Sequence, residues 1–248
     1  MKVYDHIPED QIEWARQQKM FWVATAPLSD SGHVNVSPKG ILGTTFCFVD
    51  KNRVWYEDLT GSGIETLAHL RENGRITILF HAFSGGPRIL RLHGRGVVHE
   101  FGTPEYERYI SSYERSPGSR GVIVVDVHRA STSCGFAIPF YEYKGDRLAL
   151  DNFALKKEEK GALQAYWEKS NLKSIDGLPG MQNAHRASVA PATVRQAVHE
   201  VQQTTPTATD LQRKRDTVCA VGGFFVGLLV AIMVMRFSVQ ARQLVLAL

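Results

Sequence analysis

The segment richest in potential chemistry is TGSGIET, residues 60–66, which joins a β-like run to a helical pattern. A glycine-rich turn between a strand and a helix presents unpaired backbone N–H groups and the positive end of the helix dipole. An anion site of this kind suits phosphate, and the hydroxyls of Thr60, Ser62 and Thr66 could add hydrogen-bond donors. The turn is therefore a candidate phosphate-binding site.

A second interpretation of the same turn involves no ligand. Ser62 could cap the helix, with Glu65 three residues later as its capping-box partner. The turn also matches half of a dinucleotide-binding fingerprint, at Gly61, Gly63 and Thr66. The third glycine is missing and no βαβ crossover surrounds the turn, so a Rossmann site is not expected.

Two other segments carry basic residues that could meet an anion. Lys39 lies in NVSPKG at the end of a predicted strand, where it could contact a phosphate or a flavin carbonyl. A solvated surface lysine is the alternative there. Further along, Arg91, His93 and Arg95 alternate with other residues and share one face of a strand. That basic face is either solvated or lines a groove for an anionic ligand.

Several function classes are excluded by composition and spacing. The chain has 248 residues, 44% of them hydrophobic and 22% charged, as expected of a globular protein, and 3 Cys are too few for a disulfide scaffold. A net charge of +4, without a basic run beside an aromatic stacking platform, argues against nucleic acid. No Gly-x-Ser-x-Gly elbow and no His-x3-His pair occurs, so neither a hydrolase nor a metal site is predicted.

The elements that must position these residues are mostly short strands. Runs rich in β-branched and aromatic residues, separated by Gly, Pro, Asn or Asp, predict strands at 21–26, 34–38, 45–50, 53–59, 75–83, 87–101, 121–131 and 140–144. Helices are predicted from Pro8, from Ile64 to a stop at Asn73-Gly74, within 103–116, and over 155–170. Because strands outnumber helices, the predicted fold class is mainly β, a closed or split antiparallel barrel with short flanking helices.

The order of three segments resembles a known family. NVSPKG, then WYEDLTGSGIETLAHLRENGRIT, then RLHGRG, are similar to the pyridoxamine 5′-phosphate oxidase-like flavoproteins. SCGFAIPFYEY and SIDGLPG extend the similarity to a subgroup of undefined substrate, so that it covers residues 1–181. The resemblance implies an FMN-binding, Greek-key split β-barrel that is usually a homodimer with two flavin sites at its interface. It also implies that the isoalloxazine lies along Ser37 to Gly40, and the phosphate near Thr60 to Thr66.

The sequence departs from the true oxidases in two places. Their basic pair for the FMN phosphate is replaced by Glu65-Thr66-Leu67, which removes two charge-assisted hydrogen bonds. The turn, Lys39 and Arg91 would then have to compensate. Their carboxy-terminal Arg-Leu-His-Asp-Arg block is also missing, so oxidation of the vitamin B6 phosphate is not part of the prediction.

The carboxy-terminal part predicts a membrane anchor. Residues 182–216 are polar and resemble a linker. Val218 to Met235 carry no charge and are flanked by basic residues, which predicts a transmembrane helix over 217–237 and a short tail over 238–248. The chain would then be a single-pass, tail-anchored membrane protein. The denser basic flank on the amino side favours a flavin domain that faces the cytosol.

The sequence thus predicts an FMN-dependent oxidoreductase of unknown small-molecule substrate, homodimeric and membrane-anchored. The alternatives are a flavin- or haem-binding module without turnover, serving as carrier, sensor or stress protein, and a purely structural membrane adaptor. No catalytic side chain is assigned, because a flavin carries the redox chemistry itself. The predicted cofactor-binding residues are Ser37, Lys39, Gly40, Thr60, Gly61, Ser62, Gly63, Thr66 and Arg91.

Overall fold

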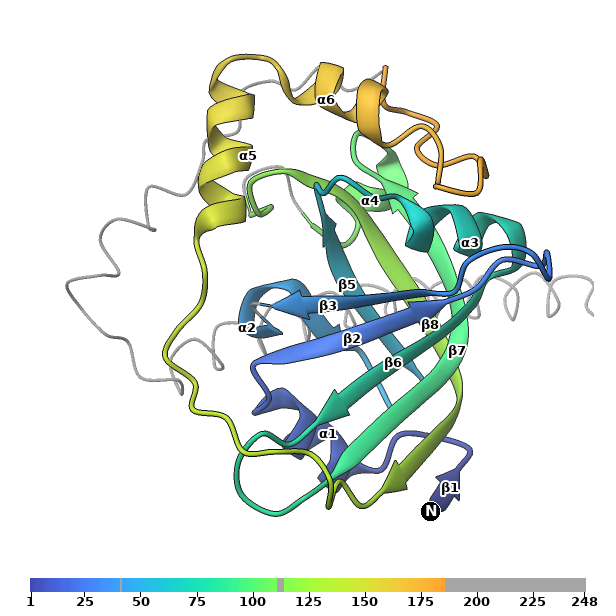
Figure 1. Ribbon diagram of the computed structural model, residues 1–248, viewed down its shortest axis with the longest axis vertical. Coiled ribbons are helices and arrows are strands. Elements are labelled where there is room, and N and C mark those ends of the chain that lie inside the picture. Colours follow the sequence, from blue (N-terminus) through green and yellow to red (C-terminus); the bar gives the residue numbers. More distant parts are fainter. Residues whose placement is uncertain (41, 111–113, 186–248) are drawn as a thin grey trace, which may run out of the picture. The chain divides into compact units, whose positions relative to one another are not determined.

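The computed structural model describes residues 1–40, 42–110 and 114–185, which are built around one curled antiparallel sheet (Figure 1). The strand order is β3-β2-β6-β7-β8-β5-β4, and β1 pairs with β8 off this path. The strands are β1 (Lys2–Tyr4), β2 (Met20–Thr25), β3 (Asn35–Gly40), β4 (Phe46–Phe48), β5 (Arg53–Leu59), β6 (Arg75–His81), β7 (Ile89–Glu100) and β8 (Ser119–Ser133). The predicted mainly β, antiparallel fold class is confirmed.

One face of the sheet lines the hydrophobic core. Buried and partly exposed side chains alternate along β2, as expected of a strand with one face in the core. Phe21 of β2 contacts Phe46, Tyr56 and Phe80 with ring centroids 4.8, 5.4 and 5.9 Å away, so four strands meet at one aromatic cluster. Edge-on and tilted arrangements of this kind are the favourable geometries for aromatic pairs.

Six short helices accompany the sheet within the described residues. They are α1 (Glu9–Arg16), α2 (Leu42–Thr45), α3 (Glu65–Asn73), α4 (Pro104–Glu107), α5 (Ala149–Glu159) and α6 (Leu163–Ser170). The predicted stop of α3 is confirmed, because Gly74 takes the left-handed conformation at φ 69° that glycine adopts without strain. The helix predicted over 155–170 is two helices instead, since the chain reverses at Gly161 with φ 60°.

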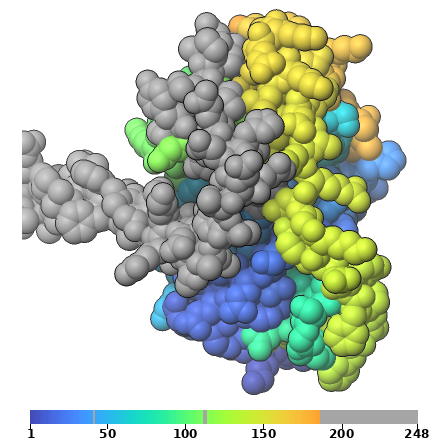
Figure 2. Space-filling view, turned by 90° about the vertical axis from the view of Figure 1, so that its left-hand side faces the viewer, coloured from blue at the N-terminus to red at the C-terminus, as the bar shows by residue number. Residues whose placement is uncertain are grey.

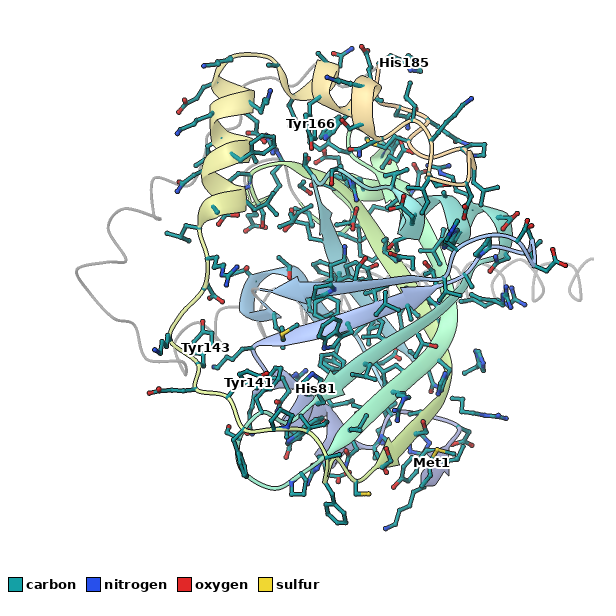
Figure 3. All side chains as sticks on the ribbon, in the orientation of Figure 1. Met1, His81, Tyr141, Tyr143, Tyr166 and His185 are labelled. Carbon is teal, nitrogen blue, oxygen red and sulfur yellow. The ribbon has the colours of Figure 1, made fainter. Side chains whose placement is uncertain are left out.

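The strand predicted over 140–144 is absent, and that prediction was wrong. Residues 134–148 have no regular secondary structure and run over the surface toward α5 (Figures 1 and 2). Tyr141 lies beside the end of β6 near His81 (Figure 3), with its ring 5.2 Å from that of Phe83 and its N–H donating to the Phe83 carbonyl. This contact does not extend into a ladder, so β propensity alone forms no strand here.

The helix predicted within 103–116 is also shorter than expected. It is described only as α4, Pro104–Glu107. Further along, the Arg115 guanidinium donates to Glu158, and the N–H of Ser116 donates to a Glu57 carboxylate oxygen. These long-range bonds hold the end of the predicted helical range against other elements, which is a tertiary effect that local propensity does not contain.

None of the helices in the described ranges is long and apolar enough to cross a membrane. The predicted transmembrane helix over 217–237, the tail over 238–248 and the predicted linker from residue 186 onward lie outside the described residues. The first residues of that linker are described, however. The N–H groups of Gln182 and Asn183 donate to the buried carboxylate of Glu100 at 2.7 and 2.6 Å, and Ala184 is buried in the core.

These contacts predict that a fragment 1–185 is more stable than a fragment 1–181. The shorter fragment loses two donors to Glu100, which keeps its ion pair with Arg71. We expect its free energy of unfolding to be lower by about 1–2 kcal/mol, since a buried acceptor is left partly unsatisfied. Urea denaturation of the two fragments measures this, and identical midpoints would show that residues 182–185 add nothing.

Candidate functional site

A cavity of about 360 Å³ opens where β3, the end of β5 and the start of α3 meet. Its volume lies in the range of small-ligand and cofactor sites. The lining comes from seven parts of the chain, so the site exists only in the folded protein. The residues are Ser37, Pro38, Lys39, Gly40, Thr45, Glu57, Leu59, Thr60, Gly61, Gly63, Glu65, Thr66, Arg120 and Leu150.

Two cations in this cavity share one buried carboxylate. Arg120 Nε lies 2.6 Å from one oxygen of Asp58, and Lys39 Nζ lies 3.4 Å from the other. The Arg120 Nη1 also donates to the carbonyl of Gly63 at 2.9 Å, which ties the guanidinium to the glycine-rich turn. These three side chains together carry one net positive charge, which suits an anionic ligand, and the carboxylates of Glu57 and Glu65 also line the cavity.

The pKa of Asp58 reflects this arrangement. Complete burial by itself raises the pKa of a carboxyl group, but the charges of Arg120 and Lys39 and their hydrogen bonds outweigh burial. The pKa of Asp58 is therefore lowered below its ordinary value, and the carboxylate stays ionised at neutral pH.

The strand pairing explains how Arg120 enters the cavity. Strands β5 and β8 are antiparallel, and their register shifts between Asp58, which faces Gly121, and Leu59, which faces Ser119. Arg120 is the extra residue of this bulge. Bulges re-aim a side chain and often occur beside functional sites. Here the bulge points the guanidinium back across the end of β5 toward the turn.

The turn itself is braced from two sides. Thr60 is buried, and its hydroxyl donates to the Gly118 carbonyl at 2.6 Å while it accepts from the Trp167 indole at 2.8 Å. Asn171, which follows α6, donates its side-chain amide to the Gly61 carbonyl at 2.9 Å. The single hydroxyl proton of Thr60 is thus committed to the fold, and in this arrangement Thr60 supports the turn instead of donating to a ligand.

No side chain among the described residues caps the amino terminus of α3. Its N-cap residue is Ile64, and the capping box of Ser62 and Glu65, the alternative interpretation of the turn, does not form. Instead, the Glu65 carboxylate accepts from the N–H of Ile175 at 3.2 Å. The first-turn amides therefore lack a side-chain acceptor, at the end of the helix where its dipole is positive.

The remaining acid of the cavity, Glu57, faces away from these cations. It accepts from the N–H and the hydroxyl of Ser116 at 2.9 and 2.6 Å, and burial raises the pKa of its carboxyl group above the ordinary value. Among the described residues that line the cavity there is no His, Cys or Tyr. Within the same described residues, no group of three His, Cys, Asp or Glu is placed to hold a metal ion.

The structure gathers most of the predicted site residues into this one cavity, namely Ser37, Lys39, Gly40, Thr60, Gly61, Gly63 and Thr66. Ser62 lines a neighbouring cavity instead. Arg91 is also elsewhere, because its neighbours Leu90 and Leu92 are buried in the core and strand alternation turns Arg91 to the other face. There its Nη1 donates to the Ser133 hydroxyl at 3.2 Å.

Arg120 and Asp58 were missed by the sequence analysis. Arg120 has no local signal, since it is a single arginine before a long apolar run. A signal for Asp58 did exist. Glu57 and Asp58 are consecutive in a strand that is otherwise apolar or aromatic after Arg53, so they point to opposite faces, and one carboxylate at least had to be buried with a partner.

The lowered pKa of Asp58 predicts how acid affects this cluster. A carboxylate with a depressed pKa stabilises the fold above its unfolded pKa of about 3.9, and this stabilisation is lost as the pH falls through the folded value. We expect Asp58→Asn to be less stable than the parent at neutral pH, and the gap to close in acid. Denaturant unfolding across pH measures the gap, and a gap that persists unchanged down to about pH 2 contradicts the assignment.

Comparisons with known proteins identify the chain's family. The family model described as pyridoxamine 5'-phosphate oxidase matches residues 7–134, which include every strand from β2 to β8. A curated relative, "Pyridoxamine 5'-phosphate oxidase family protein ustO" of Aspergillus flavus, is 37% identical over 197 residues, covering 74% of this chain and 79% of the relative.

Solved structures that match part of this chain include HupZ of Group A Streptococcus, at 21% identity and a TM-score of 0.40, covering 50% of this chain and 92% of that one. Another is a protein of Listeria innocua described as a putative pyridoxamine 5'-phosphate oxidase, at 20% identity and a TM-score of 0.33. That match covers 50% of this chain and 96% of the Listeria protein. The family model and the curated relative, taken together, decide the assignment. The chain belongs to the pyridoxamine 5'-phosphate oxidase family.

Proposed function

We propose that this protein binds FMN in the cavity between β3 and α3 and acts as an FMN-dependent oxidoreductase. The observation that carries the proposal is the net positive cluster of Lys39, Arg120 and Asp58 next to the uncapped start of α3. A helix amino terminus with adjacent cations is suited to a phosphate group. Membership of a family whose members commonly bind flavin supports the same ligand.

The residues of the cavity fit a flavin nucleotide in both its polar and its apolar part. Lys39 and Arg120 supply charged donors, which take the place of the basic pair that the sequence lacks at Glu65-Thr66. Leu59 and Leu150, the latter from α5, provide apolar surface for a ring. When bound, FMN would supply the electron transfer, and this chain's residues would hold and orient it.

A non-enzymatic flavin-binding module is the second candidate. The observation in its favour is that the described cavity lining has no His, Cys or Tyr, and that Glu57 is held by Ser116. A protein that only carries or senses flavin needs no acid or base beside it. Anaerobic mixing of the FMN-loaded protein with NADPH separates the two. Rapid loss of the oxidised flavin absorbance supports the enzyme, and an unchanged spectrum with a panel of reductants supports the carrier.

The assembly and location of the protein are further parts of the proposal. Val34 and Val36, 70% and 60% exposed, are apolar residues on and beside β3, and a homodimer with flavin at its interface would cover such a surface. The anchor over 217–237, with a cytosolic flavin domain, rests on the sequence pattern alone. Carbonate extraction of the full chain and of a 1–212 truncation tests it, and a fully soluble parent protein would contradict it.

Titration of FMN into the purified full-length protein tests the central proposal. Trp167 is buried and donates to Thr60 at the edge of the cavity, so binding is expected to change tryptophan fluorescence and quench flavin fluorescence. We expect one FMN per chain, and light scattering is expected to show a dimer. A protein that stays colourless and changes neither signal after reconstitution with excess FMN would overturn the proposal.

A further inference from the structure

A network of hydroxyl groups joins the cavity to a buried histidine through one carboxamide. Asn35, the first residue of β3, contacts three hydroxyls at once. Its Nδ2 donates to Thr25 Oγ1 at 3.1 Å and to Thr66 Oγ1 at 3.0 Å, and its Oδ1 accepts from Ser37 Oγ at 2.9 Å. Thr66 and Ser37 line the cavity, whereas Asn35 does not.

The protons of this network can be assigned by counting donors and acceptors. A carboxamide has two N–H protons, and both are used on the threonine oxygens. Each of these oxygens therefore accepts, and must direct its own proton elsewhere. Thr25 and His69 are buried and Thr25 Oγ1 lies 3.0 Å from His69 Nδ1, so a neutral His69 ring can accept the Thr25 proton at that nitrogen.

The state of His69 agrees with this assignment. Burial lowers the pKa of His69 below its ordinary value, which favours the neutral ring. Its Nε2 is buried without a hydrogen-bond partner among the described residues. A neutral ring places one unpaired N–H there, whereas a charged ring would leave a buried, incompletely solvated cation, which is far more costly.

The network fixes which side chains in the cavity donate hydrogen bonds to a ligand and which accept them, and this arrangement is the polarity of the cavity. Thr66 Oγ1 accepts from Asn35, so its proton remains for a group inside the cavity. Ser37 Oγ gives its proton to Asn35, so it presents lone pairs. The cavity thus has a donor at the start of α3, where phosphate oxygens require donors, and an acceptor on β3, where a ligand hydroxyl or N–H can donate.

We propose that Asn35 is a positioning residue that sets this polarity, holding Thr66 as a donor to the phosphate and Ser37 as an acceptor from the rest of the ligand. The inference rests on the proposed FMN site and names a residue that acts without touching the ligand. It predicts that Asn35 affects the preference for FMN over riboflavin, which lacks the phosphate, and that it does so through Thr66.

The test is a double-mutant cycle. For each variant, the measured quantity is the riboflavin dissociation constant divided by the FMN dissociation constant. In Asn35→Asp the carboxylate can only accept, so Thr66 turns its proton toward it and away from the ligand. We expect Asn35→Asp to lower this ratio about 3- to 10-fold more when residue 66 is threonine than when it is valine, as in Thr66→Val. That difference corresponds to the loss of one neutral hydrogen bond. Repulsion between the new charge and the phosphate occurs in both backgrounds and cancels in the cycle.

Two further variants keep the test decisive. Asn35→Ala removes the donor without adding charge, and serves if Asn35→Asp does not fold. It frees the Thr66 proton to turn into the vacated space, so its effect must also depend on Thr66. Ser37→Ala is the matched control, because it is expected to weaken riboflavin and FMN equally and to leave the ratio unchanged.

The outcomes separate this inference from the proposed function. A parent protein that prefers FMN, combined with Asn35 variants whose effects are the same in both Thr66 backgrounds, overturns the role of Asn35 and leaves the FMN site standing. A parent protein that binds FMN and riboflavin equally overturns the phosphate site itself, and the role of Asn35 with it.

Discussion

Replacing Glu158 by glutamine is expected to lower the free energy of unfolding by about 3–5 kcal/mol. Glu158 and Arg115 form a bidentate pair at 2.7 and 2.9 Å, with each side chain only 3% exposed. The same carboxylate accepts from the N–H of Gly118 at 2.7 Å. Glutamine keeps the volume but removes the negative charge, so the buried Arg115 guanidinium loses the carboxylate that pairs with it.

The exposed pair Arg53–Asp126 is the matched control. Its oxygen and nitrogen are also 2.7 Å apart, but its side chains are 48% and 60% exposed. Asp126→Asn is therefore expected to change stability by about 0–1 kcal/mol. Denaturant unfolding of both variants gives the comparison, and equal losses in the two would show that burial does not decide the strength of these pairs.

A second variant tests whether the loss comes from the unpaired charge. In the double variant Arg115→Met with Glu158→Leu, both charges are gone and apolar side chains fill the space. We expect much of the stability lost in Glu158→Gln to return, because replacing a buried ion pair by apolar residues is often neutral or stabilising. A double variant as unstable as the single one would point to packing, or to the lost bond at Gly118, as the cause.

Replacing Lys39 by methionine is expected to weaken FMN binding tenfold to a hundredfold and to leave riboflavin binding unchanged. The loss of one charge-assisted hydrogen bond costs about 1.5–3 kcal/mol, which corresponds to that range in affinity. Lys39 is partly exposed at the cavity wall, and Asp58 keeps a second, closer cation in Arg120. The fold is therefore expected to tolerate the substitution, which a flavin titration combined with thermal unfolding would measure.

Lys51→Met is the control for this experiment. Lys51 is an exposed lysine in the turn before β5, at the opposite end of that strand from the cavity. The Lys51→Met substitution removes the same charge from the protein as Lys39→Met. An equal loss of FMN affinity in the two variants would therefore show that Lys39 acts on the ligand only through long-range electrostatics. If Lys39→Met binds FMN and riboflavin as the parent does, Lys39 is a surface residue and takes no part in binding.

Local patterns in the sequence are sufficient to predict much of this protein. The two-residue alternation along β2, β6 and β7 predicts strands with one buried face, and Gly74 predicts the end of α3, since both depend on neighbours in the chain. The glycine-rich turn and Lys39 lie beside strand ends for the same local reason. These features predict the mainly β fold, and they place most of the candidate site.

Contacts between distant segments decide the rest. Arg120 is 62 residues from Asp58 in the chain, and a bulge in the β5–β8 pairing brings their side chains together. Arg91 turns away from the cavity because its strand is held in one register, and a shift by one residue would reverse every side chain. Thr60 gives its proton to Gly118 because the two strand ends meet there. Residue types and spacing thus determine which groups can bind an anion, but strand register and burial determine which of them have a free proton or charge to offer.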